Sequence, residues 1–190
     1  MAYIYNEYAT FFRVLSNKTR FTILKVLNQA AKEMSVSNIA VVGNISISKI
    51  SDQLTVLRKN DLVKYRRQGN LVNYCIDKKK FYDQLFAYYK ELATDLNDHY
   101  ISFIFQRPFD PECLNIYKVL ANETRCEIMI HVAKKNLSVS ELCNMFYLEQ
   151  PTISMHLRYM KQLNLISSKR QKTLKYYFIS PNKVAQKISA

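Results

Sequence analysis

Apolar residues recur at helical spacing through the first 60 residues of the chain. This pattern predicts one helix near residues 3–15 and a second that begins after Asn17, whose side chain suits an N-cap. Ser35 opens a short third helix, and a fourth runs from about Ser46 to Asn60. Apolar residues of the fourth helix fall at i, i+3, i+7 and i+10, which predicts one buried stripe. The members of this stripe are Ile47, Ile50, Leu54 and Leu57.

Two runs rich in β-branched and aromatic residues follow, Leu62–Arg67 and Leu71–Ile76. The residues between them, Gln68-Gly69-Asn70, have the composition of a hairpin turn. Four helices followed by a hairpin are typical of a winged helix-turn-helix domain. The helices on either side of Val42-Gly43-Asn44 then form the helix-turn-helix, and the fourth helix is the one expected in the major groove of DNA.

The second half of the chain repeats this pattern. Leu15–Arg20 returns as Leu120–Arg125, and Ile50–Leu54 returns as Ile153–Leu157. The offset is 105 residues at the first pair and 103 from Ser35 onward, so one two-residue length difference near residues 28–34 explains the register. The second copy predicts helices at 110–121, 122–135, 138–145 and 149–163, and strands at 165–170 and 174–179. A repeat this long is a duplicated domain and not a solenoid unit.

Between the copies, residues 79–105 are rich in aromatic and aliphatic side chains and contain no Gly or Pro. Their spacing predicts one long amphipathic helix, which Arg107-Pro-Phe-Asp-Pro111 ends. We expect this helix to pack against the first helices of the copies, or those of a partner. The predicted fold is therefore mainly α with small β-hairpin wings. It comprises two tandem winged helix-turn-helix domains (residues 1–80 and 110–190) joined by a long helix and linker (81–109).

Composition restricts the functional classes. Lys and Arg exceed Asp and Glu by 28 to 15, and the excess is shared by both halves. A basic surface of this kind attracts polyanions such as nucleic acid. The chain has only two glycines, so it lacks Gly-rich phosphate-binding loops, and its three histidines show no nucleophile–base pattern. No run is long and apolar enough for a membrane span. We therefore expect no enzyme activity, no cofactor and no membrane partner.

The second copy carries a family resemblance. Val119–Arg125, Leu137–Leu142 and Glu149-Gln-Pro-Thr-Ile-Ser-Met-His-Leu157 together resemble the ArsR/SmtB family of bacterial winged-helix regulators. The resemblance is strong over residues 113–180 and weaker over 8–80. It implies a cytoplasmic, nucleoid-associated bacterial transcription regulator, commonly a repressor. Family members are usually dimers, joined through their first and last helices, that release DNA when a metal or another signal binds.

The resemblance also implies which residues contact double-stranded DNA. On the second recognition helix they are Gln150, Thr152, Ser154, Met155, His156 and Arg158, and on the first they are Ser48, Lys49, Ser51 and Gln53. Gln can pair with adenine, and hydroxyls reach phosphates or base edges. Met155 replaces the arginine usual in the family, and a packing role for His156 is the alternative. Asp52 is acidic where DNA would lie, unless it accepts from a cytosine amino group.

The two hairpins carry clusters of cations at matching positions. The predicted phosphate contacts are Lys64, Arg66, Arg67 and Asn70 on the first wing, and Lys169, Arg170, Lys172 and Lys175 on the second. Because the clusters recur in both copies, phosphate or minor-groove contact is favoured over a merely solvated hairpin. The unlike recognition helices predict that the copies do not read the same sequence.

The chain shows little sign of a sensory site. The third helix of the second copy offers only Cys143 where a family metal site uses paired cysteines, and Asp95, Asp98 and His99 lack paired spacing. Cys126 and Cys143 lie on adjacent predicted helices, so a redox pair is conceivable, but buried structural thiols are favoured. The sequence predicts no metal site.

Two questions of function and assembly stay open at this stage. The first is whether the chain is a DNA-binding regulator or a winged-helix protein-interaction module with little sequence-specific DNA reading. The second is whether the two copies pair within one chain as a pseudo-dimer, which we favour, or whether chains form a homodimer. Salt-dependent binding to specific duplexes separates the first pair of alternatives.

Overall fold

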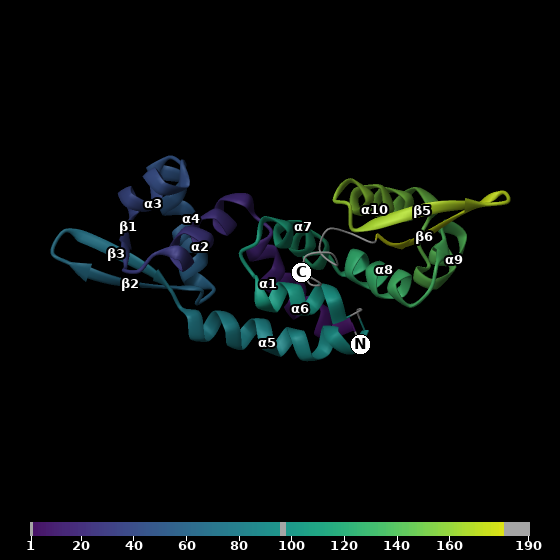
Figure 1. The fold of residues 1–190 in the computed structure, drawn as a ribbon, viewed down its shortest axis with the longest axis horizontal. Helices are drawn as coiled ribbons and strands as arrows, with labels where there is room; N and C mark the ends of the chain where they lie inside the picture. Colours follow the sequence, from purple (N-terminus) through teal and green to yellow (C-terminus); the bar gives the residue numbers. More distant parts are fainter. Residues whose placement is uncertain (1, 96–97, 181–190) are drawn as a thin grey trace.

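The structure, a computed structural model, describes residues 2–95 and 98–180 of the chain. It is elongated, with a small winged domain at each end of the long axis and helices between them (Figure 1). The two hairpins point away from each other at the opposite ends. The fold is that of two tandem winged helix-turn-helix domains, as the repeat predicts.

The first winged domain has three helices and three strands. They are α2 (Lys18–Gln29), β1 (Met34–Ser35), α3 (Val36–Gly43), α4 (Ile47–Lys59), β2 (Val63–Gln68) and β3 (Leu71–Ile76). Asn17 caps α2 as expected, because its side chain accepts from the amides of Thr19 and Arg20. Ser35 caps α3 in the same way by accepting from the amide of Asn38.

The second winged domain repeats this order. Its elements are α8 (Glu123–Lys134), β4 (Leu137–Ser138), α9 (Val139–Phe146), α10 (Gln150–Gln162), β5 (Ile166–Gln171) and β6 (Leu174–Ile179). The two-residue length difference falls in one loop, since four residues separate α2 from β1 and two separate α8 from β4. Ser138 and Glu141 form a reciprocal capping box at the start of α9.

Each wing belongs to a three-stranded sheet. The hairpin strands pair antiparallel in the expected register, for example Tyr65 with Tyr74. The short strands β1 and β4, which the sequence does not predict, each add to the far side of a hairpin and give the orders β1-β3-β2 and β4-β6-β5. Two-residue strands carry too little alternation to stand out in a sequence. They tie the base of each wing to the start of the third helix.

The segment between the winged domains differs from the prediction of one long helix. It forms α5 (Lys78–Asp95) and α6 (Asp98–Gln106). The rings of Tyr82 and Phe105 lie 6.2 Å apart, whereas 23 residues of continuous helix would separate them by about 34 Å. The chain therefore folds back, and α6 packs along α5 (Figure 1). Tyr82 and Phe86 of α5 contact Phe105 of α6. The helical spacing of apolar residues therefore reflects two helices that face each other and not one continuous helix.

Helices α1 (Ala2–Leu15) and α7 (Pro111–Leu120), the first helices of the two copies, pack against each other in the middle of the molecule. Phe12 stacks on Tyr117 with ring centroids 5.6 Å apart, and the 105-residue offset makes these two residues equivalent in the repeat. The Tyr117 hydroxyl is buried and donates to the carbonyl of Pro108 at 2.8 Å. Burial raises the pKa of this phenol well above its usual value.

Helix α5 covers the other side of α1. Phe11 contacts Phe81 and Tyr88, and Phe81 stacks on Phe109 at 5.0 Å. The expected packing of this segment against a first helix therefore occurs within the chain. One continuous cluster of buried apolar side chains runs from Phe11 through both winged domains to Tyr177. The two copies share a core, and each small domain gains buried area from the other.

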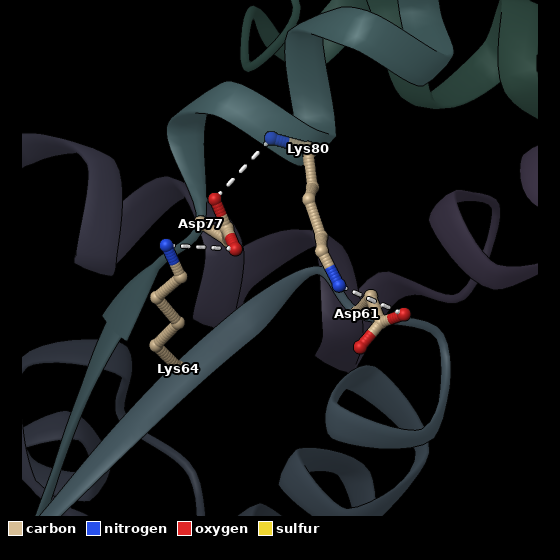
Figure 2. Close-up of polar contacts among 4 residues, drawn as sticks. All are labelled: Asp61, Lys64, Asp77 and Lys80. Atoms are coloured by element: carbon tan, nitrogen blue, oxygen red, sulfur yellow. Dashed lines mark hydrogen bonds and ion pairs between the residues drawn. The ribbon is translucent and has the colours of Figure 1, made fainter.

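The base of the first wing is fixed to α5 by charge (Figure 2). Buried Asp77 pairs with Lys64 at 3.0 Å and accepts from the backbone amide of Lys80, while the Lys80 ammonium pairs with Asp61 at 3.1 Å. At the equivalent positions of the second copy, Ser167 and Ser180 share a 2.9 Å hydrogen bond instead. The same junction is thus ionic in one copy and neutral in the other.

Within the described residues, no helix has both the length and the apolar character needed to cross a membrane.

Candidate nucleic-acid interface

The first recognition helix, α4, buries one face and exposes the other. Ile50, Leu54 and Leu57 are fully buried, whereas Ser48, Lys49 and Ser51 are exposed. The prediction that Ile47 belongs to the buried stripe is wrong, because its side chain is 56% exposed. Ile47 is the first residue of α4, and at a helix end the periodic pattern does not guarantee a neighbour that covers the side chain.

Gln53 is half-buried and held by Arg20 of α2. The Arg20 guanidinium donates to Gln53 Oε1 at 2.9 Å, and also to the carbonyls of Val14 and Arg13 at the end of α1. Burial lowers the pKa of Arg20, but arginine side chains in proteins remain charged. The oxygen of Gln53 is thus engaged within the protein.

The second recognition helix, α10, follows the same plan. Ile153, Leu157 and Met160 are buried. The predicted DNA contacts divide by exposure: Gln150, Met155 and Arg158 are exposed, while Thr152, Ser154 and His156 are half-buried. The structure therefore places three of the six side chains fully on the surface and the other three along its flanks.

His156 occupies the position equivalent to Gln53, and Arg125 that equivalent to Arg20. Desolvation first, and the positive charge of Arg125 second, lower the pKa of His156 and favour its neutral imidazole. Arg125 donates to the carbonyl of Lys118 at 2.9 Å and lies over the ring of Tyr159, 4.8 Å from its centroid. In both copies an arginine therefore joins the first helix to the recognition helix.

Sequence patterns do not single out this arginine as a functional residue. A signal is present, since Leu15–Arg20 and Leu120–Arg125 are the best-preserved segments of the repeat. What the sequence could not show is the partner, because Gln53 lies 33 residues from Arg20. Arg20 and Arg125 each contact both the recognition helix and the first helix of their own copy.

The wings expose all eight predicted side chains. Lys64 is engaged with Asp77 although it is 64% exposed, and Arg67 donates from Nε to the carbonyl of Gly69 at 3.3 Å. Lys175 lies over the ring of Tyr177 at 5.6 Å. The remaining wing cations project from the hairpins into solvent.

A contact at equivalent positions joins each wing to its recognition helix. In the first copy the Arg58 guanidinium lies 5.3 Å from the centroid of the Tyr65 ring. In the second copy Lys161 Nζ donates to Ser168 Oγ at 3.2 Å. Wing and recognition helix therefore form one unit in each copy, with cations along the line where they meet.

Among the residues whose side chains are described, no group of three or more His, Cys, Asp or Glu side chains could hold a metal ion. The four cysteines form no disulfide; Cys113 and Cys126 are buried, and Cys75 and Cys143 are half-buried. Burial raises the pKa of Cys75, which makes it less reactive. The segment from Asp95 to His99 lies outside the described side chains.

Comparisons with known proteins agree with the geometry. The family model described as "Bacterial regulatory protein, arsR family" matches twice, over residues 17–65 and 122–168, and these segments cover α2 to β2 and the start of α8 to β5. Together the two matches take in just over half of the chain. This family comprises regulatory proteins and is not a family of enzymes.

Individual relatives match about one copy each. A transcriptional repressor SmtB homolog from Synechocystis is 33% identical over 48% of this chain and 65% of its own length. A cadmium resistance regulatory protein CadC homolog from Staphylococcus aureus is 31% identical over 46% of this chain and 74% of its own. Among solved structures, HlyU from Vibrio cholerae is 27% identical over 41% of this chain and 85% of that one, with a TM-score of 0.37.

The chain thus spans slightly less than two thirds of the SmtB homolog while carrying the family domain twice. Both copies have the helix order, the wing and the family match. The protein belongs to the arsR family of bacterial regulatory proteins, as a tandem duplication of the family domain in one chain.

Proposed function

We propose that this protein is a double-stranded DNA-binding transcriptional regulator, acting as a repressor that occupies a promoter. The observation that carries the proposal is the pairing, in each copy, of an exposed recognition-helix face with a cationic wing. In the second copy Arg158 and Lys161 are exposed on α10, and Lys161 contacts the second wing. In the first copy Arg66 and Arg67 are exposed on the wing itself. Cations on these elements neutralise phosphates while the helix meets base edges.

The two copies act as a pseudo-dimer within one chain. Support comes from the α1–α7 packing, in which Phe12 contacts its own repeat equivalent, Tyr117. A residue that meets its own counterpart is the signature of a two-fold axis. Such an axis relates the recognition helices in the way a symmetric dimer would. A homodimer of chains would then present four winged domains.

The reading faces are unlike, so the DNA site is asymmetric. Asp52 of α4 corresponds to Met155 of α10, and Lys49 corresponds to Thr152. One carboxylate and one apolar side chain at the same position cannot favour the same base pair. A single chain therefore reads two different half-sites, about one turn of DNA apart.

Equilibrium binding as a function of salt tests the proposal. Duplexes enriched by selection from a random library serve as the probe, and random duplexes as the reference. Replacement of Arg66 and Arg67 by Gln, or of Lys169 and Arg170 by Gln, should weaken binding and lower the salt slope by about 0.9 for each phosphate that is no longer neutralised. Lys79→Gln is the matched control, because Lys79 lies on α5 and belongs to neither a wing nor a recognition helix.

Equal slopes for the wing variants and the control would contradict the assigned wing role. Equal affinity for selected and random duplexes would contradict sequence-specific reading. The second result would favour a winged-helix module that binds proteins in place of DNA.

A further inference from the structure

Exposed large apolar side chains gather on the helix-turn-helix and wing elements. Among the described residues, one such side chain lies on each recognition helix: Ile47 on α4, 56% exposed, and Met155 on α10, 58% exposed. Burial of either side chain against an apolar element of a partner surface would be favourable. The partner must also suit the cations that surround them.

Met155 lies at the centre of the exposed face of α10. It is two residues from Ile153 and two from Leu157, which are both fully buried. At 3.6 residues per turn, a two-residue step rotates the side chain by about 200°, so Met155 points directly away from the core. No core role explains an unbranched thioether at this position.

Ile47 is the first residue of α4, and its equivalent in the second copy is Gln150, the first residue of α10. Residues at the N-terminal end of a recognition helix are those that contact base edges in helix-turn-helix proteins. The repeat therefore pairs Ile47 with Gln150, and Asp52 with Met155. Each helix carries one apolar and one polar side chain at these two positions, in reversed order.

The major groove has one apolar feature, the C5-methyl group of thymine, and apolar side chains contact it. We infer that Ile47 and Met155 read thymine methyl groups, from non-equivalent positions of the two recognition helices; this rests on the DNA-binding function proposed above. Asp52 and Gln150 then face cytosine and adenine edges, respectively. The reversed order places the thymine at a different offset in each half-site.

Charge decides for DNA over an apolar protein partner. Arg158 lies one turn beyond Met155 on the same face of α10, and Lys49 lies in the first turn of α4. Both cations are exposed, and they suit an apolar feature bordered by phosphates. A protein partner for these residues would need acidic groups around a small apolar group. Duplex DNA already has this combination at every A·T pair, where phosphates flank the methyl group of thymine.

Deoxyuridine substitution provides the test, because uracil differs from thymine only by the missing methyl group. Each thymine of the selected duplex is replaced in turn, and the affinity of the full chain is measured. We expect about a fourfold loss at one or more thymines in each half-site, equivalent to ~0.8 kcal/mol for one buried methyl group. Other thymines should tolerate the change.

The variants Met155→Ala and Ile47→Ala assign the contacts. Both side chains are exposed, so neither change disturbs the core. Each variant should bind thymine and uracil duplexes equally at its own half-site and stay sensitive at the other. Val41→Ala, at an exposed apolar residue of α3, is the matched control and should keep the wild-type profile.

The possible outcomes separate this inference from the function on which it rests. If the wild type prefers the selected sequence but tolerates uracil everywhere, the inference is overturned and the function stands. If uracil sensitivity persists in both alanine variants, the assignment to Ile47 and Met155 is overturned. If no sequence preference exists at all, the proposed function fails together with the inference.

Discussion

The backbone at Lys172 is strained, whereas the backbone at the equivalent position of the first wing is not. Its φ is 54°, in the left-handed region, and its equivalent in the first wing is Gly69 with φ 59°. Glycine adopts this conformation freely, whereas a residue with a Cβ is strained there. The second wing therefore carries an extra cation at its tip together with backbone strain.

Lys172→Gly should stabilise the protein by about 1 kcal/mol by relieving this strain. The same change should lower the salt slope of DNA binding by about 0.9, because it removes one of the proposed phosphate contacts. Thermal denaturation and salt titration measure the two effects separately. A loss of stability in Lys172→Gly would contradict the strain, and an unchanged slope would contradict the phosphate contact.

Sequence patterns predicted which side chains of the recognition helices are exposed, but not the partners of those side chains within the protein. They placed Ser48, Lys49 and Arg158 on the surface, because helical periodicity separates buried from exposed positions. They failed at Ile47, the first residue of α4, because no neighbouring side chain buries it there. They also gave no sign that Gln53 is held by Arg20, because that contact depends on how α2 crosses α4.

At the scale of elements, the ion pair at the base of the first wing is the clearest point of asymmetry. Burial alone would raise the pKa of Asp77, but hydrogen bonds from Lys64 and Lys80 and their charges outweigh it and lower this pKa below its ordinary value. Because the pKa of Asp77 is lower in the folded state than in the unfolded state, its ionised form stabilises the fold at every pH above the unfolded-state pKa. This stabilisation is lost as the pH falls through the folded pKa.

Asp77→Asn should therefore cost about 1 kcal/mol at pH 7, a modest value because Lys64 is largely exposed to water. The difference from wild type should shrink as the pH falls below about 4. Denaturant unfolding at several pH values measures it. Ser167→Ala is the control in the second copy, where the junction is neutral. A difference for Asp77→Asn that is independent of pH would contradict the ionic account.

Element boundaries followed closely from the sequence where caps mark them. The observed starts of α2 and α7 fall within about one residue of the prediction, since Asn17 and Pro111 are strong local signals at helix starts. The segment 79–105 was predicted as one helix because apolar residues keep helical spacing through it. Aromatic contacts between α5 and α6 show that the chain reverses instead.

For the whole molecule, the shared core predicts that the two copies unfold together. Phe12 is 1% exposed and lies at the α1–α7 contact. Phe12→Ala should cost about 3–5 kcal/mol and weaken the coupling between the copies. Calorimetry should show one transition for the wild type and a lower, broader or split transition for the variant. Phe86→Ala, at a half-exposed aromatic residue of α5, is the control and should cost less.

A single sharp transition in Phe12→Ala, at nearly the wild-type temperature, would contradict the shared core. The tandem architecture itself could be predicted from sequence, because the repeat keeps the same order of elements and one offset. The residues that join the copies could not be predicted, because the packing of Phe12 on Tyr117 leaves no periodic signal in the chain.

The central claim is that one chain places two recognition helices with unlike exposed faces on one DNA duplex. Selection of bound fragments from random DNA, combined with the mass of the resulting complex, tests it most directly. We predict an asymmetric site made of two different half-sites about one helical turn apart, with one chain bound across each such pair. Two identical half-sites occupied by two chains, or the absence of any enriched sequence, would contradict the account.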